Sequence, residues 1–212
     1  MGIFEDWKLT PAELNEIMAE NPSLKGFTFG YVCEYKVRKI WFSDKRVSEV
    51  IKYNDHDRTR KGDISFIYKG VRLSVEVKSL QTNSLKNVDD HPTGKFQCDA
   101  SDSRIVTLPS GDRLKTTCLL VGEFDILAVS LFQFKNEWIF GFAKNSALPR
   151  SNYNKYSNDQ KNFLLATSMS ISDPIQPPFY LDPFPLLDEI VEEKKTKGDK
   201  NFIIIERKTK GE

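Results

Sequence analysis

Residues 62–78 predict a short β-hairpin that places two carboxylates opposite each other at its open end. Lys69-Gly70 suits a two-residue turn, because glycine adopts the positive φ that tight hairpins need. A turn there pairs apolar residues across the strands and also pairs Asp63 with Glu76. Side chains directly opposite lie roughly 4.5–5.5 Å apart, and like charges at that spacing are destabilising. The pair therefore needs a compensating group, and a hard divalent cation that takes oxygen ligands, such as Mg²⁺, is the simplest.

Lys78 adds a cationic group to the same site. It lies two residues beyond Glu76, so its side chain leaves the same face of the strand. Two acids and a lysine on one side of a sheet can cleave phosphodiesters. The spacing from Asp63 to Glu76-Val77-Lys78 resembles the PD-(D/E)XK nuclease superfamily, with its restriction-endonuclease-like fold. Gly62 stands where the nominal motif has proline, and the resemblance covers about residues 24–140.

The resemblance implies a role for each residue of the motif. Asp63 and Glu76 would bind Mg²⁺, for which Mn²⁺ can substitute. The Val77 backbone carbonyl would be a third ligand, and Lys78 would orient or deprotonate the attacking water.

Two further residues match the superfamily in type and order. A glutamate on the helix before the hairpin often reaches towards the metal, which makes Glu34 a candidate metal ligand, with a surface glutamate as the alternative. A glutamine closely follows the lysine in several branches, so Gln81 is a candidate assisting residue. An ordinary polar residue at a strand end is its alternative.

Basic residues gather around the motif although the net charge of the chain is only +1. From residue 36 to residue 72 there are eleven Lys or Arg and five Asp or Glu. A basic field around an acidic pocket suits a polyanion that must approach a metal, whereas for any single residue a solvated surface is the simpler interpretation. Arg58, Arg60 and Lys61 directly precede Asp63 and are the expected phosphate contacts.

Length and cysteine content indicate an ordinary reduced protein. The 212 residues form one large domain, or one domain with a small appendage. Cys33, Cys98 and Cys118 suggest neither a disulfide framework nor a zinc site, which predicts buried thiols. No apolar run has membrane-spanning length, and the N-terminus lacks the features of a secretory signal, so a cytoplasmic location is expected.

Two helices are predicted before the hairpin. A Thr10–Glu13 capping box with proline at the first helical position predicts a helix to about Asn21. A longer helix is predicted over residues 24–42. Helical spacing predicts that four of its residues face the core, and two glycines predict close packing against the sheet. The four are Leu24, Phe27, Tyr31 and Tyr35, and the glycines are Gly26 and Gly30.

The remaining pattern predicts a layered α/β (α+β) fold. Residues 124–134 are strongly apolar and predict a buried central strand, with residues 137–142 returning as its neighbour. A central mixed sheet of about five strands flanked by helices is expected. We expect residues 1–150 to form the nuclease core, with N-terminal helices and an inserted hairpin at about 82–115. Residues 151–212 would be an extension of loop, helix and strand packed on that core.

These features predict a Mg²⁺-dependent DNA endonuclease. The sequence has no Walker P-loop and no G-x-S-x-G element, and neither His56 nor His91 has the context of a ββα-metal nuclease. Together with the superfamily resemblance, these absences imply a Type II-like restriction endonuclease that cuts double-stranded DNA. It would be a homodimer with the apolar segment 202–205 as a possible interface, and a separately encoded cognate DNA methyltransferase could accompany it. A junction-resolvase-like repair or recombination nuclease and a non-catalytic nucleic-acid-binding protein remain the alternatives.

Overall fold

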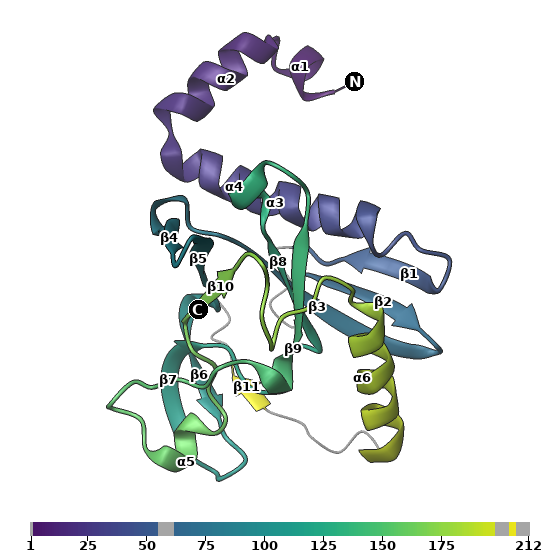
Figure 1. Ribbon diagram of the computed structural model, residues 1–212, viewed down its shortest axis with the longest axis vertical. Helices are drawn as coiled ribbons and strands as arrows, with labels where there is room; N and C mark the ends of the chain where they lie inside the picture. The colour runs from purple at the N-terminus through teal and green to yellow at the C-terminus, as the bar shows by residue number, and fades with distance from the viewer. Residues whose placement is uncertain (1, 55–61, 198–203, 207–212) are drawn as a thin grey trace, which may run out of the picture.

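A five-stranded mixed sheet forms the centre of the protein, as predicted (Figure 1). The computed structural model describes residues 2–54, 62–197 and 204–206. The strand order is β1-β2-β3-β8-β9, in which β3 and β8 run parallel and the other neighbours run antiparallel. The bounds are β1 Val47–Lys52, β2 Ile64–Tyr68, β3 Val71–Ser79, β8 Ile126–Ser130 and β9 Phe140–Lys144.

The register predicted for the β2–β3 hairpin is confirmed from the turn to the Ile64–Val75 pair, whereas the predicted Asp63–Glu76 pair lies beyond the paired residues. Phe66 pairs with Leu73, and Tyr68 pairs with Val71 across the turn. Lys69 and Gly70, the two turn residues, have φ values of 48° and 78°. Positive φ at both positions is the geometry whose twist matches that of the flanking strands.

Strand β8 is buried along its whole length because both faces of the sheet are covered. Ile126 and Ala128 belong to one hydrophobic core, whereas Leu127 and Val129 belong to a second core on the opposite face. A strand buried on both faces reads as a continuous apolar run. This explains why residues 124–134 contain the most apolar stretch of the chain.

Helices α3 (Pro22–Ile40) and α6 (Phe184–Lys197) both contribute to the first core. Helix α3 supplies Cys33 and Val37, and α6 supplies Leu187 and Val191. The C-terminal region thus shares the main core through α6, which begins where the Asp182 carboxylate accepts the Phe184 N–H at 2.9 Å. Short helix α4 (Phe132–Lys135) links β8 to β9, and α5 (Asn158–Lys161) lies in the C-terminal region (Figure 1).

The face of α3 that was predicted to enter the core is exposed. The exposed fractions are 41% for Leu24, 72% for Phe27, 48% for Tyr31 and 50% for Tyr35. Cys33, Glu34 and Val37 are the buried residues of this helix. Helical spacing shows which residues share one side of a helix, but it carries no information about which side meets the sheet. The predicted close packing of Gly26 and Gly30 is also wrong, because a Cβ at either position would meet nothing within 4 Å.

The N-terminal arm, residues 2–21, contains α1 (Ile3–Asp6) and α2 (Pro11–Glu20). The predicted capping box is confirmed: Glu13 N–H donates to Thr10 Oγ1 at 3.2 Å, and Thr10 N–H donates to Glu13 Oε2 at 2.7 Å. Neither helix has a buried residue. Figure 1 shows the arm beyond α3, on the side away from the sheet.

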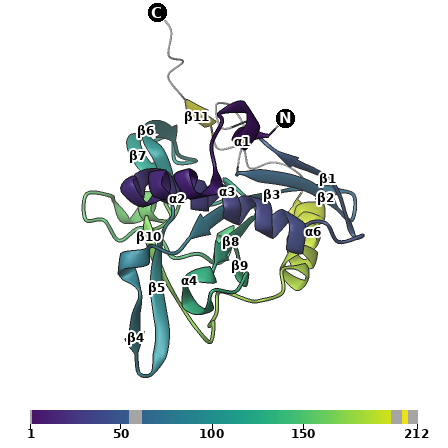
Figure 2. The same ribbon diagram turned by 90° about the horizontal axis from the view of Figure 1, so that it is seen from above.

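Two hairpins occupy the region where one inserted hairpin was predicted. In the first, β4 (Lys86–Val88) pairs with β5 (His91–Gln97), which also pairs with β10 (Ser168–Ser172). Figure 2 shows β4 and β5 extending from the body. In the second, β6 (Asp99–Thr107) pairs with β7 (Arg113–Cys118) and with β11 (Ile204–Glu206).

The pairing of β11 changes the expectation for the segment 202–205. Ile204 and Ile205 pair with Thr107 and Val106 of the same chain, so their strand does not need a second chain to supply its neighbour. Phe202 and Ile203 lie outside the described residues. No helix in the described ranges is long and apolar enough to cross a membrane.

Candidate functional site

Gly62 brings the chain into close contact with the neighbouring strand directly before Asp63. Its φ is +70°, and a Cβ at this position would lie 2.7 Å from the Val75 carbonyl oxygen. The next residue, Asp63, donates its N–H to that same oxygen at 2.8 Å. Proline is held at φ near −65° and cannot adopt the observed φ of +70°, so this backbone conformation requires glycine in place of the proline of the nominal motif.

The Asp63 carboxylate is fixed against the adjacent strand. Its Oδ2 accepts the Val77 N–H at 2.7 Å. Burial raises the pKa of Asp63, the positive charge of Lys78 opposes this shift, and the negative charge of Glu34 adds to it. The open end of the hairpin therefore holds a partly desolvated acid among other charged groups.

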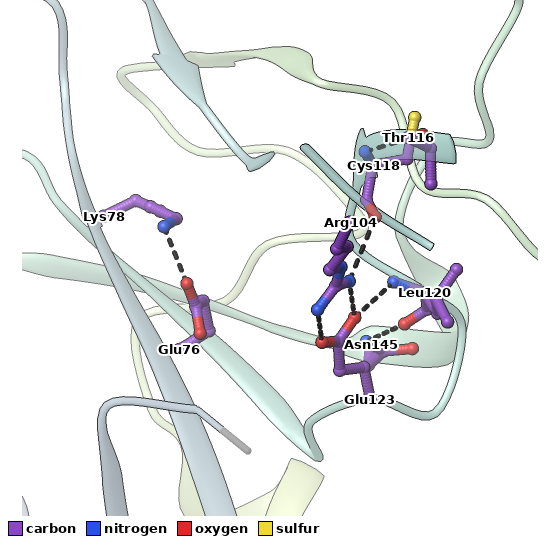
Figure 3. A network of polar contacts seen from close by, with 8 residues as sticks. All are labelled: Glu76, Lys78, Arg104, Thr116, Cys118, Leu120, Glu123 and Asn145. Carbon is purple, nitrogen blue, oxygen red and sulfur yellow. Dashed lines mark hydrogen bonds and ion pairs between the residues drawn. The ribbon is translucent and has the colours of Figure 1, made fainter. Parts of the chain in front are cut away.

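Glu76 and Lys78 form an ion pair on β3 (Figure 3). Lys78 Nζ lies 2.6 Å from Glu76 Oε1, and Glu76 is 9% exposed. Burial raises the pKa of Glu76 to about 7, and the negative charge of Asp63 contributes to the increase. Burial alone would lower the pKa of Lys78, but the charges of Glu76 and Asp63 outweigh it and raise that pKa above its ordinary value. Lys78 is therefore a protonated ammonium group beside two acids.

The raised pKa of Glu76 predicts a pH-dependent stability of the metal-free protein. A folded-state pKa of about 7 lies above the ordinary glutamate pKa of 4.5, so the folded protein holds the proton more tightly than the unfolded chain. The contribution of Glu76 to the free energy of unfolding is therefore fully present below about pH 4.5 and is lost as the pH rises to about 7. Urea unfolding in EDTA should therefore show that wild type has a lower free energy of unfolding at pH 7.5 than at pH 5. Glu76→Gln should reduce this difference. A wild-type loss that Glu76→Gln leaves unchanged would assign the pH dependence to other groups.

A second acid–lysine pair borders the site. Lys52, at the end of β1, places Nζ 2.9 Å from Glu34 Oε2, and Glu34 is buried on α3. Lys52 lowers the pKa of Asp63, in opposition to the effect of Glu34. Its Nζ also lies 5.1 Å from the centre of the Tyr31 ring. Sequence reasoning did not find Lys52, because no local pattern connects residue 52 with residue 34.

The donor groups fit a hard cation that keeps part of its water shell. Asp63 and Glu76 supply two carboxylates that disfavour each other's ionisation, and such a pair is stabilised by positive charge. In the described ranges, no group of three or more His, Cys, Asp and Glu side chains could hold a metal ion. Mg²⁺ is commonly held by one or two carboxylates together with water and phosphate oxygens, so two acids suffice. The role of Glu34 as a ligand stays a prediction, and its carboxylate is engaged with Lys52.

The structure does not place the remaining predicted site residues beside Asp63, Glu76 and Lys78 in the described part of the chain. Gln81 lies beyond the end of β3, and its Nε2 donates to Gln97 Oε1 at 3.2 Å. Arg58, Arg60 and Lys61 lie outside the described residues, so their expected phosphate contacts stay predictions.

A buried polar network lies near the site (Figure 3). Arg104 of β6 forms an ion pair with Glu123, and the side chains are 7% and 5% exposed. Arg104 Nη2 also donates to the Cys118 carbonyl at 3.1 Å, and Glu123 Oε2 accepts the Leu120 N–H at 2.8 Å. Glu123 contributes to the raised pKa of Glu76. This network connects the second hairpin to the chain segment that leads into β8.

The three cysteines are free and buried, as predicted. Cys98 is close enough to Lys78 and Glu76 for both to affect it. Burial raises the pKa of its thiol to about 12, against the opposing effect of Lys78. A thiol in this state is neutral at physiological pH and contributes packing to the site.

Comparisons with known proteins give one structural similarity. No protein-family model matches the chain, and no curated protein matches it. Among solved structures, the chain is similar to a bacterial homing endonuclease, I-Ssp6803I, with a TM-score of 0.35 and 12% sequence identity. The similarity covers 84% of this chain and 97% of the other. At this identity and TM-score the similarity carries no argument about function.

Proposed function

We propose that this protein is a metal-dependent DNA endonuclease. The observation that carries the proposal is the arrangement of buried Glu76 with half-buried Asp63 and Lys78 at the end of the β2–β3 hairpin, with the pKa of Glu76 raised to about 7. A purely structural hairpin would gain stability from apolar residues at these positions. Buried, mutually repelling acids are costly and are typical of functional sites.

Asp63, Glu76 and the Val77 carbonyl would hold the cation. When bound, Mg²⁺ supplies positive charge to the scissile phosphate and makes a nearby water a stronger acid. The Val77 N–H orients the Asp63 carboxylate through the 2.7 Å hydrogen bond. The geometry of one acid is thereby set by the strand that carries the other acid.

Lys78 has a separate role in this proposal. Its raised pKa keeps it protonated, so it donates hydrogen bonds to the attacking water and offsets the charge that develops on the phosphate. A protonated ammonium cannot accept the proton of that water, which favours orientation over general-base catalysis. Lys52 adds a second positive charge at the border of the site.

The proposed substrate is duplex DNA. Eleven Lys or Arg in residues 36–72 provide the positive field that a polyphosphate needs to approach two acids. We propose a Type II-like restriction activity, because the sequence contains no P-loop for energy coupling. Mg²⁺ would be the cofactor, with Mn²⁺ as a substitute.

Cleavage of a DNA panel tests this proposal. Purified protein would be incubated with Mg²⁺, Mn²⁺ or EDTA and with plasmid, single-stranded and branched DNA. Discrete plasmid fragments that require the metal are expected. Cleavage confined to branched DNA would instead assign a resolvase function, and no cleavage of any substrate would favour a non-catalytic nucleic-acid-binding protein.

Replacing Asp63 with asparagine should stabilise the metal-free protein and remove most of the stabilisation that metal gives. Asparagine keeps an oxygen for the Val77 N–H but removes one of two repelling charges, so Asp63→Asn should melt higher than wild type in EDTA. Metal should stabilise wild type by about 2.7 kcal/mol at a hundredfold excess over Kd, and the variant should lose most of that gain. Calorimetry across a Mg²⁺ or Ca²⁺ titration would show the two melting temperatures converging or crossing.

The matched control is Asp90→Asn, an exposed turn position at which asparagine tolerates the observed φ of 61°. This variant should retain the wild-type response to metal. Equal metal-induced shifts in Asp63→Asn and wild type would remove Asp63 from the set of ligands.

A further inference from the structure

In the part of the chain that the structure describes, large apolar side chains of the N-terminal arm and of one face of α3 are exposed. We call the α3 surface formed by Leu24, Phe27, Tyr31 and Tyr35 the aromatic face. The arm exposes apolar side chains of its own, since Ile3 is 46% exposed, Phe4 39% and Trp7 66%. Exposed apolar residues that form a continuous patch, unlike scattered ones, mark interaction surfaces.

The arm packs only partly on the rest of the chain, because Leu14, Ile17 and Met18 of α2 are half-buried. Helix α2 has ten residues and α1 has four, and neither has a buried residue. Isolated helices of this length are marginal in water, and helices in proteins gain most of their stability from packing an apolar face. The arm also does not cover the aromatic face of its own chain, because Phe27 remains 72% exposed.

The two segments that carry these surfaces differ in charge. Residues 3–20 contain five acidic residues and one lysine, which gives a net charge of 1 − 5 = −4. Helix α3 contains three Lys and one Arg against a single glutamate, a net charge of 4 − 1 = +3. That glutamate, Glu34, is already paired with Lys52. At the C-terminal end of the aromatic face, Arg38 and Lys39 lie 6.0 and 5.6 Å from the centre of the Tyr35 ring.

We infer that a second copy of this chain covers the aromatic face with its N-terminal arm. Each chain carries one acidic arm and one basic aromatic face, so two chains can exchange arms reciprocally and close with twofold symmetry. A polyphosphate is a poorer occupant, because the acidic arm extends beside the same helix and would repel it (Figure 1). This inference rests on exposure and charge at α1–α3 and is independent of the proposed nuclease activity.

Light scattering of the full chain is the first measurement. Wild type should have twice the 24.4 kDa mass of one chain. Phe27→Asp should weaken dimerisation by more than about a hundredfold, because a symmetric interface loses the contact twice. The side chain is 72% exposed, so circular dichroism should remain that of wild type. The matched control is Leu181→Asp, which alters an apolar residue of 52% exposure outside the arm and α3 and should stay dimeric.

A charge exchange tests which surfaces meet. One variant carries Glu16→Lys and Glu20→Lys in the arm, and the other carries Arg38→Glu and Lys39→Glu on α3. Each alone should be monomeric, since both of its arm–face contacts join like charges. An equimolar mixture should form a heterodimer, because one contact then joins the two exchanged surfaces and the other joins two native surfaces.

Three results would overturn the inference. The first is a wild type that is monomeric. This holds also if added DNA protects its aromatic face. The second is a dimer that Phe27→Asp leaves unchanged. The third is a pair of monomeric charge variants that fail to associate on mixing.

Discussion

Lys78→Ala is expected to abolish metal-dependent DNA cleavage while DNA binding persists. The ammonium group lies 2.6 Å from Glu76 and stays protonated, so its removal takes away the positive charge nearest the proposed reaction centre. Loss of one preorganised electrostatic group costs roughly 10²–10³-fold in rate. Single-turnover cleavage of plasmid DNA measures the loss, and Asp63→Ala and Glu76→Ala should each abolish cleavage as well.

Two controls separate catalysis from folding in that experiment. Lys86→Ala removes an exposed lysine of β4 and should cleave like wild type. Lys78→Met keeps the aliphatic stem of the side chain and should be as inactive as Lys78→Ala, with its unfolding curve measured in parallel. Cleavage by Lys78→Ala at nearly the wild-type rate would show that the site has been assigned to the wrong residues.

Arg104→Met is expected to destabilise the protein by about 3–5 kcal/mol. The substitution leaves the buried Glu123 carboxylate without its cationic partner, and an uncompensated buried charge carries a cost of that size. Urea unfolding at pH 7 measures the change. Arg104→Met combined with Glu123→Leu should recover part of the loss, because replacing both members of a buried pair by apolar residues is often neutral.

An exposed ion pair provides the comparison. Lys135 and Asp173 lie 2.5 Å apart, and their side chains are 54% and 24% exposed. Lys135→Met should cost at most about 1 kcal/mol, since solvent screens such pairs. A cost for Arg104→Met no larger than that for Lys135→Met would mean that Arg104 does not stabilise the second hairpin.

The hairpin, the first capping box and the central strand were predictable because neighbours along the chain decide them. The β2–β3 register follows from a glycine turn and from alternating apolar residues within seventeen positions. Thr10 and Glu13 form their hydrogen bonds within one helical turn. Strand β8 is apolar at every position because both of its faces are buried.

The orientation of α3 and the pairing of distant charges could not be predicted from these local patterns. Two stripes of α3 have apolar side chains, and only the sheet selects the one with Cys33 and Val37 for the core. The Lys52–Glu34 and Arg104–Glu123 pairs join residues 18 and 19 positions apart on different elements. Local sequence is sufficient to specify the hairpin and the acids that it carries. The charges that surround those acids depend on the tertiary structure, because long-range packing sets the burial and the charge–charge distances that shift their pKa values.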